Sequence, residues 1–239
     1  IRKLYNALMR LVLFDIDGTL IMTDGAGKRA MSSALQKTYN LKDGLKNIRL
    51  DGKTDPQIVR EALHQCGKES LLNNQSLHNF FDAYIPLLET EIKQSSTYQI
   101  LPGVPELLDK LSTQDDIVLG LATGNIERGA QTKLHRGNLT SFFTLGGYGS
   151  DSGNRTELIR IAIKRALKDV APPSEFIETF VVGDTPRDII HAQRAGTRTL
   201  AVATGRYSVK SLLSYTPDFA IPNLSNTSKI VDILTGQII

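Results

Sequence analysis

Short runs of hydrophobic residues alternate along the chain with longer segments in which hydrophobic residues recur every three or four positions. The short runs predict β-strands, and the spaced pattern predicts amphipathic helices. Three runs, at 11–14, 117–122 and 180–182, are almost wholly hydrophobic, as expected of strands covered on both faces. The sequence therefore predicts an α/β fold with a Rossmann-like, doubly wound parallel sheet. The predicted strands are residues 10–15, 117–123, 142–146, 179–184, 198–203 and 218–221.

A different pattern fills residues 26–95, where no convincing strand is found. Leu, Lys, Gln, Asn and Glu recur there at helical spacing, which predicts three helices. Pro56 suits a helix start and Gly67 a helix stop, whereas Pro86 should kink or split the third helix. The predicted helices are residues 27–40, 55–67 and 76–94.

This change of pattern predicts two domains. Residues 10–22 and 97–239 are expected to form the α/β core, and residues 23–96 a helical domain inserted into it. Polar joining segments near 20–25 and 95–100 are expected to act as a hinge, and closure of the insertion would expel water from a site between the domains.

The composition of the chain limits the classes of partner and the cellular location that we expect for the protein. A chain of 239 residues with 41% hydrophobic residues can bury a large core. The net charge of +3 is spread out, with no Lys/Arg run longer than two residues, so a nucleic-acid partner is not expected. No hydrophobic run reaches membrane-spanning length, and the start of the chain is a poor signal peptide, so we expect a cytoplasmic protein without a membrane partner.

Met9 directly precedes the first predicted strand and would make a natural start. Residues 1–8 are therefore interpreted as an upstream extension or a remnant of the expression vector.

Chemically reactive residues follow three of the predicted strands. Ligands bind beyond the carboxyl ends of the strands in such sheets, so these three segments are expected to converge. Their acids would repel one another without a cation, and a set of oxygen ligands at a partly open site suits Mg²⁺. The residues concerned are Asp15 and Asp17, Thr123, Gly124 and Asn125, and Asp184 and Asp188.

The same residues predict phosphate chemistry. A carboxylate can attack phosphorus and form an aspartyl-phosphate, provided that cations offset the repulsion between the two anions. Asp17 could serve as general acid and base, and Thr123 with the Gly124–Asn125 backbone could bind phosphate oxygens. Each motif alone is more often an ordinary turn or helix start, and it is their joint placement after three strands that favours a site.

At this point the chain resembles the haloacid dehalogenase superfamily, through "FDIDGTL", "LATGN" and "VVGDTPRDI". The resemblance covers the whole core and places the helical insertion where the phosphoglycolate phosphatase-like branch has its cap domain. It implies that Asp15 is the nucleophile and Asp17 the general acid/base. It also implies that Asp15, the Asp17 carbonyl group and Asp184 hold Mg²⁺, with Asp188 assisting.

One family motif departs from the usual pattern. The family usually places a lysine near the start of the helix before the fourth motif, where this chain has Arg155. Arginine is always charged and could supply the same electrostatic stabilisation with a different geometry. Lys164 is the rival, but it lies more than two turns into the predicted helix.

The predicted cap contains the polar segment "RLDGKTDPQIV", which resembles the loop that this branch points into its active site. Arg49 and Lys53 could there bind an anionic group of the substrate remote from the phosphate. An ordinary helix–helix loop with solvated charges fits the segment equally well.

The predicted function is a Mg²⁺-dependent phosphatase acting on a small phosphorylated metabolite, phosphoglycolate being the family-level favourite, as a monomer or homodimer. A sugar phosphomutase similar to β-phosphoglucomutase is the nearest alternative. A phosphonate hydrolase with Lys53 as its Schiff-base lysine is weaker, because Asp17 favours ester hydrolysis. A catalytically silent phosphate-binding homologue is also weaker, because Asp15, Asp17 and Asp184 are all retained. A phosphoaspartate receiver would lack the helical insertion.

Overall fold

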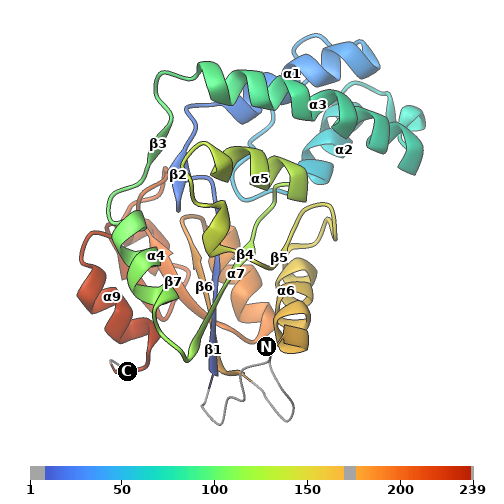
Figure 1. Cartoon of the computed structure of the whole chain (residues 1–239). Helices are drawn as coiled ribbons and strands as arrows, with labels where there is room; N and C mark the ends of the chain where they lie inside the picture. Colours follow the sequence, from blue (N-terminus) through green and yellow to red (C-terminus); the bar gives the residue numbers. More distant parts are fainter. Residues whose placement is uncertain (1–8, 170–175, 238–239) are drawn as a thin grey trace.

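The computed structural model describes residues 9–169 and 176–237, so the proposed extension at 1–8 lies outside the described residues. In this part of the chain a parallel sheet runs in the order β5-β4-β1-β6-β7-β8 (Figure 1). The predicted doubly wound α/β fold is confirmed. The strands are β1 (Met9–Phe14), β4 (Ile117–Ala122), β5 (Gly146–Gly147), β6 (Phe176–Gly183), β7 (Arg198–Val202) and β8 (Phe219–Ile221).

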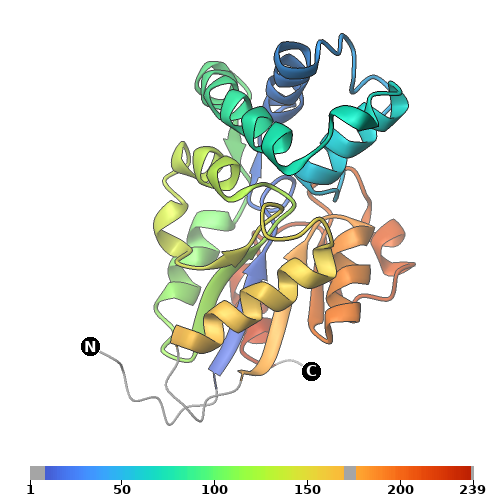
Figure 2. The same ribbon diagram turned by 90° about the vertical axis from the view of Figure 1, so that its right-hand side faces the viewer.

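Helices cover both faces of this sheet, as the uninterrupted hydrophobic strands require. Alternate residues of β1 point to opposite faces: Val12 and Phe14 pack with α4 and α9, whereas Leu11 and Leu13 pack with α6 and α7. Figure 2 shows α6 crossing in front of the sheet. The core helices are α4 (Val104–Ser112), α5 (Glu127–His135), α6 (Arg155–Asp169), α7 (Pro186–Ala195), α8 (Val209–Leu213) and α9 (Thr227–Leu234).

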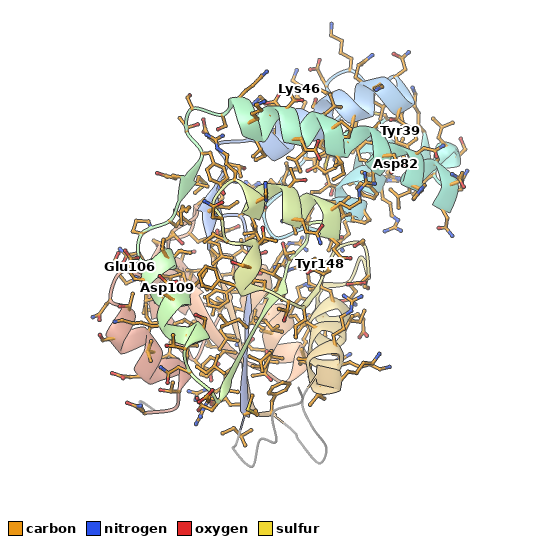
Figure 3. All side chains as sticks on the ribbon, in the orientation of Figure 1. Tyr39, Lys46, Asp82, Glu106, Asp109 and Tyr148 are labelled. Atoms are coloured by element: carbon orange, nitrogen blue, oxygen red, sulfur yellow. The ribbon has the colours of Figure 1, made fainter. Side chains whose placement is uncertain are left out.

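The surface helix α4 illustrates how the sequence pattern sets this packing. Leu107 and Leu108 are buried against the sheet. Glu106 and Asp109 lie on the outer, exposed side of the same helix (Figure 3).

None of the helices in residues 9–169 and 176–237 combines the length and the hydrophobicity of a membrane-spanning segment.

One predicted strand is wrong in most of its length. Residues 142–145 lie outside any strand: Thr140–Phe142 form a 3₁₀ turn, and strand β5 begins only at Gly146. The hydrophobic run reflects burial rather than pairing, since Phe143 packs edge-on against Phe14 at a ring distance of 6.0 Å. The other five predicted strands are confirmed within three residues at either end.

The three predicted helices between 26 and 95 are also present, as α1 (Ala26–Tyr39), α2 (Asp55–Gln65) and α3 (Asn74–Gln94), with a 3₁₀ turn at Glu69–Leu71. They form a hydrophobic cluster of their own, to which Ile126 of the core is added. We call these helices the cap and keep residues 23–96 as its proposed extent.

Pro86 does not split α3, which runs unbroken through it. Proline removes the hydrogen bond to the carbonyl group four residues earlier, here that of Asp82. Both Asp82 and Pro86 are exposed, so this side of the helix faces water and its freed carbonyl group can be hydrated.

The segments that join cap and core pair with each other, which the sequence analysis did not predict. Ile21–Met22 (β2) and Gln99–Ile100 (β3) form a two-stranded antiparallel sheet. In Figure 1 this ribbon rises from the main sheet toward the cap.

Candidate active site

The acids of the first and fourth motifs lie together at the carboxyl ends of two neighbouring strands. Phe14 of β1 is level with Val182 of β6, so Asp15 and Asp184 leave the sheet at the same edge. Asp188 joins them from the first turn of α7. One carboxylate oxygen from each of the three residues lies within 4.8 Å of the others.

Local structure fixes the position of Asp188. Thr185 and Asp188 form a capping box at the start of α7, with Pro186 in the first turn. Asp188 Oδ2 accepts hydrogen bonds from the Thr185 hydroxyl at 2.7 Å and from the Thr185 amide at 3.0 Å. The motif that begins the helix therefore also orients a carboxylate of the cluster.

Burial and mutual repulsion disfavour the charged forms of these acids. Burial raises the pKa of Asp15 to about 6, against the lowering effect of Arg155, and Asp188 raises it further. Burial also raises the pKa of Asp184 well above its usual value, reinforced by Asp188 and Asp15. A divalent cation among the three would stabilise their charged forms.

The surroundings of Asp184 fit such a cation. A side chain on either Gly18 or Gly205 would overlap the Asp184 carboxylate, so the backbone encloses it closely on two sides. Among the described residues its side-chain hydrogen-bond donor is the Thr19 hydroxyl, at 3.4 Å. Carboxylate oxygens are ligands that Mg²⁺ binds in proteins.

Arg155 supplies the positive charge of the cluster. It begins α6 and is 3% exposed. Its Nη2 lies 3.4 Å from Asp15 Oδ2 and donates a hydrogen bond to Asp188. Lys164, the rival for the family's lysine, is exposed on the same helix.

The residues of the second motif lie next to Asp15 and line the same cavity. Thr123 is fully buried at the end of β4, and its hydroxyl accepts hydrogen bonds from the Asn125 amide NH₂ at 2.9 Å and from the Asn125 backbone at 3.3 Å. Gly124 lies against the Lys53 carbonyl group of the cap, where any side chain would clash. All three residues line one cavity with Asp15, Asp17 and Asp184.

This cavity has a volume of about 260 Å³ and lies between the strand ends and the cap. Lys53 lines it and forms an ion pair with Glu61. Arg49 is exposed and is not among the residues that line the cavity. The structure thus brings Lys53, but not Arg49, to the site.

Two residues at this site were missed by the sequence analysis. Lys133 of α5 is buried, and its ammonium group donates to Asp17 and to Asn125. Asp55, at the start of α2, is buried and accepts a hydrogen bond from the Ile126 amide at 2.9 Å. The signal for Lys133 was its place on the hydrophobic face of its helix, between Ala130 and Leu134.

Comparison with known proteins decides the family. A family model described as "Haloacid dehalogenase-like hydrolase" matches residues 12–202. The chain belongs to this family. The resemblance found in its motifs is therefore confirmed, and the match runs from β1 to β7 across the cap.

Relatives of this haloacid dehalogenase-like hydrolase include named phosphatases. It is 28% identical over 229 residues to a phosphoglycolate phosphatase of Aquifex aeolicus, covering 94% of this chain and 97% of that protein. It is 25% identical to the pyrophosphatase PpaX of Oceanobacillus iheyensis, covering 93% and 97%. These names support the predicted enzyme class, a phosphoric monoester hydrolase.

A solved structure shows the same fold. The β-phosphoglucomutase of Clostridium difficile superimposes with a TM-score of 0.69 at 15% identity, covering 96% of this hydrolase and 98% of that chain. The likeness extends over the cap as well as the core.

Proposed function

We propose that this protein is a Mg²⁺-dependent phosphatase that hydrolyses a small phosphorylated metabolite through an aspartyl-phosphate on Asp15. The observation that carries the proposal is the buried cluster of Asp15, Asp184 and Asp188 beside Arg155, at the floor of the cavity. Asp15, the Asp17 carbonyl group and Asp184 would hold the metal ion, with Asp188 assisting. When bound, Mg²⁺ would offset the negative charge of the acids and of the phosphate.

The residues of the chain then divide the reaction into two steps. An Asp15 oxygen forms a bond to phosphorus, the ester P–O bond breaks, and Asp17 gives a proton to the leaving oxygen. Asp17 next takes a proton from water as this water attacks phosphorus, which releases phosphate and regenerates Asp15. Thr123, the backbone of Gly124 and Asn125, and Arg155 would hold the phosphate oxygens.

The size and charge of the cavity favour a small anionic substrate. A volume of about 260 Å³ is below the range of roughly 300–1,000 Å³ typical of drug-sized ligand sites. Lys28, Lys53 and Arg206 line it in addition to the phosphate-binding residues. A second anionic group, as in phosphoglycolate, could bind Lys28 directly, or Lys53 or Arg206 in competition with their partners Glu61 and Asp51. We place the reaction in the cytoplasm.

Phosphate release from p-nitrophenyl phosphate tests the reaction class. We expect activity that requires Mg²⁺ and that is lost in Asp15→Asn. Asp109→Asn, on the exposed side of α4, is the matched control and should behave as wild type. Activity that survives Asp15→Asn, or that is unaffected by removing divalent cations, would contradict the proposal.

A panel of phosphorylated metabolites would then identify the substrate. Release of inorganic phosphate identifies a phosphatase, whereas an isomeric sugar phosphate without phosphate release would identify a phosphomutase.

A further inference from the structure

Lys133 is a buried cation that none of the family motifs includes. Its side chain is 6% exposed, and its Nζ lies 2.6 Å from Asp17 Oδ2 and 2.6 Å from Asn125 Oδ1. The helix that carries it, α5, lies between the strand ends and α3 (Figure 1). Burying an ammonium group is costly without partners, so these two contacts account for its position.

The contact of Lys133 with Asn125 fixes the orientation of the Asn125 amide. With Oδ1 bound to the ammonium group, the NH₂ group must face the other way. There it donates to Asp17 Oδ2 at 2.9 Å and to the Thr123 hydroxyl at 2.9 Å. Lys133 therefore sets the orientation of an amide that links the first and second motifs.

The contact of Lys133 with Asp17 makes the two carboxylate oxygens of Asp17 different. Oδ2 accepts from both Lys133 and Asn125, so it is occupied by two donors. Oδ1 has no hydrogen-bond partner among the described residues, and the Asp17 side chain is 41% exposed and lines the cavity. Oδ1 is therefore the oxygen left free to exchange a proton with a group bound in the cavity.

We propose that Lys133 is a positioning residue for Asp17. It holds Oδ2 and the Asn125 amide so that Oδ1 presents the transferable proton to the leaving group in the cavity. This inference rests on the proposed function, in which Asp17 protonates the leaving oxygen. It assigns to Lys133 no contact with the substrate.

The dependence on the leaving group separates this role from a purely structural one. p-Nitrophenolate leaves without a proton, whereas an alkoxide leaving group needs one. General acid–base catalysis contributes about 10²–10⁴-fold. In Lys133→Met, we expect kcat/KM to fall about 10²-fold or more for glycerol phosphate, and less than about 10-fold for p-nitrophenyl phosphate.

A double-mutant cycle with Asp17→Asn adds a second readout. Because Lys133 acts through Asp17, adding Lys133→Met to Asp17→Asn should not lower kcat/KM for glycerol phosphate any further relative to kcat/KM for p-nitrophenyl phosphate. Arg128→Met is the matched control: Arg128 lies on the same helix and pairs with Asp82 of the cap at 2.6 Å, outside the cavity. It should leave the ratio between the two substrates unchanged.

Equal losses for both substrates, or fully additive losses in the double variant, would overturn the inference. If Lys133→Met does not fold, Lys133→Arg is the second variant, because it keeps the charge with a different geometry. It should also lower kcat/KM more for glycerol phosphate than for p-nitrophenyl phosphate, by a smaller factor. An unchanged ratio of kcat/KM between the two esters would overturn the inference. A wild-type protein inactive on both esters, or an active Asp15→Asn variant, would instead overturn the proposed function.

Discussion

Arg155 stands where the family usually has a lysine, and its surroundings show how an arginine can serve there. It is enclosed between the carboxylates of Asp15 and Asp188, and its guanidinium group reaches both at once. Both contacts are made by the same nitrogen, Nη2, which lies between the two carboxylates and keeps a positive charge there at every accessible pH. The buried Nε has no hydrogen-bond partner among the described residues.

Replacing Arg155 should therefore remove activity. We expect Arg155→Met to lower kcat by about 10²–10³-fold, the usual effect of losing one preorganised group that stabilises transition-state charge. Arg155→Lys should keep part of the activity, because the charge remains. Arg160→Met, which breaks an exposed ion pair with Glu157 on the same helix, is the control and should stay near wild type. Steady-state kinetics with p-nitrophenyl phosphate checks this, and an active Arg155→Met variant would exclude the assigned role.

The raised pKa of Asp55 predicts that the free energy of unfolding depends on pH. Burial raises its pKa from 3.8 to about 6, although Lys133 and the Ile126 amide act in the opposite direction. The folded protein therefore holds this proton more tightly than the unfolded chain. The cost of the charged carboxyl group is absent below about pH 4, grows as pH rises toward 6 and is complete above that.

Asp55→Asn should accordingly raise the free energy of unfolding by up to about 3 kcal/mol at pH 7.5 and change it little at pH 4. Urea unfolding at the two pH values measures both differences. Asp109→Asn, exposed on α4, should show no such pH dependence. A gain that is equal at both pH values, or larger at pH 4, would contradict the assignment.

Residue positions tied to strand ends were predictable from the sequence, because a strand that ends in acids leaves them at the sheet edge. Asp15, Asp184 and Asp188 are brought together in this way. Lys133 and Asp55 were not predicted, since each depends on what packs over it in three dimensions. A lysine in a helix is normally solvated, and only the contact of α5 with the strand ends reverses that expectation.

At the scale of elements, the loop after β7 lies so close to the acid cluster that it limits where the Asp184 carboxylate can lie. Gly205 follows β7 and has no backbone requirement for glycine, but a side chain there would overlap the Asp184 carboxylate. The loop after β7 therefore shapes the proposed cation site through its backbone alone.

Gly205→Ala should displace Asp184 and weaken Mg²⁺ binding. We expect the rise in Tm on adding Mg²⁺ to be largely lost in this variant, because only the folded state binds the ion. Gly129→Ala, inside α5, meets only ordinary van der Waals contacts and is the control, with an undiminished rise. Thermal unfolding with and without Mg²⁺ measures the difference. A full rise in Gly205→Ala would contradict the inference that the close approach of Gly205 to Asp184 is needed for Mg²⁺ binding.

The elements themselves were predicted where pattern and burial agree. The five strands with strong hydrophobic runs and the three cap helices follow directly from the sequence. The run at 142–146 was misleading because Phe143 is buried outside any strand and pairing with β4 begins only at the Leu145 carbonyl group, which accepts from the Leu121 amide at 3.1 Å. The short strands β2 and β3 could not be predicted, since two-residue strands leave no periodic signal and form only through each other.

At the scale of the whole molecule, the cavity exists only where cap and core meet. Several contacts between cap and core are polar: Arg206 pairs with Asp51 at 2.7 Å, and the Asp55 amide donates to the Gly124 carbonyl group at 2.8 Å. These polar contacts exchange readily with water, whereas Ile126 of the core packs in the hydrophobic cluster of the cap. The β2–β3 ribbon and the cap form the movable part in our interpretation.

We therefore predict that the cap closes more tightly on ligand. Small-angle scattering should show a smaller radius of gyration with Mg²⁺ and orthovanadate than without them, as expected for a closing domain. Asp15→Asn, which cannot bond to the analogue in the same way, should show a smaller change. An identical scattering profile in both conditions would rule out closure of this kind.

Capture of the phosphoryl group on the protein tests the central claim most directly. Wild-type enzyme would be mixed with a phosphate ester and Mg²⁺, quenched in acid within milliseconds and digested for mass spectrometry. We predict phosphate on the peptide that contains Asp15, and none in the Asp15→Asn variant. Turnover without phosphorylation of this peptide, or with phosphate on a different residue, would contradict the account.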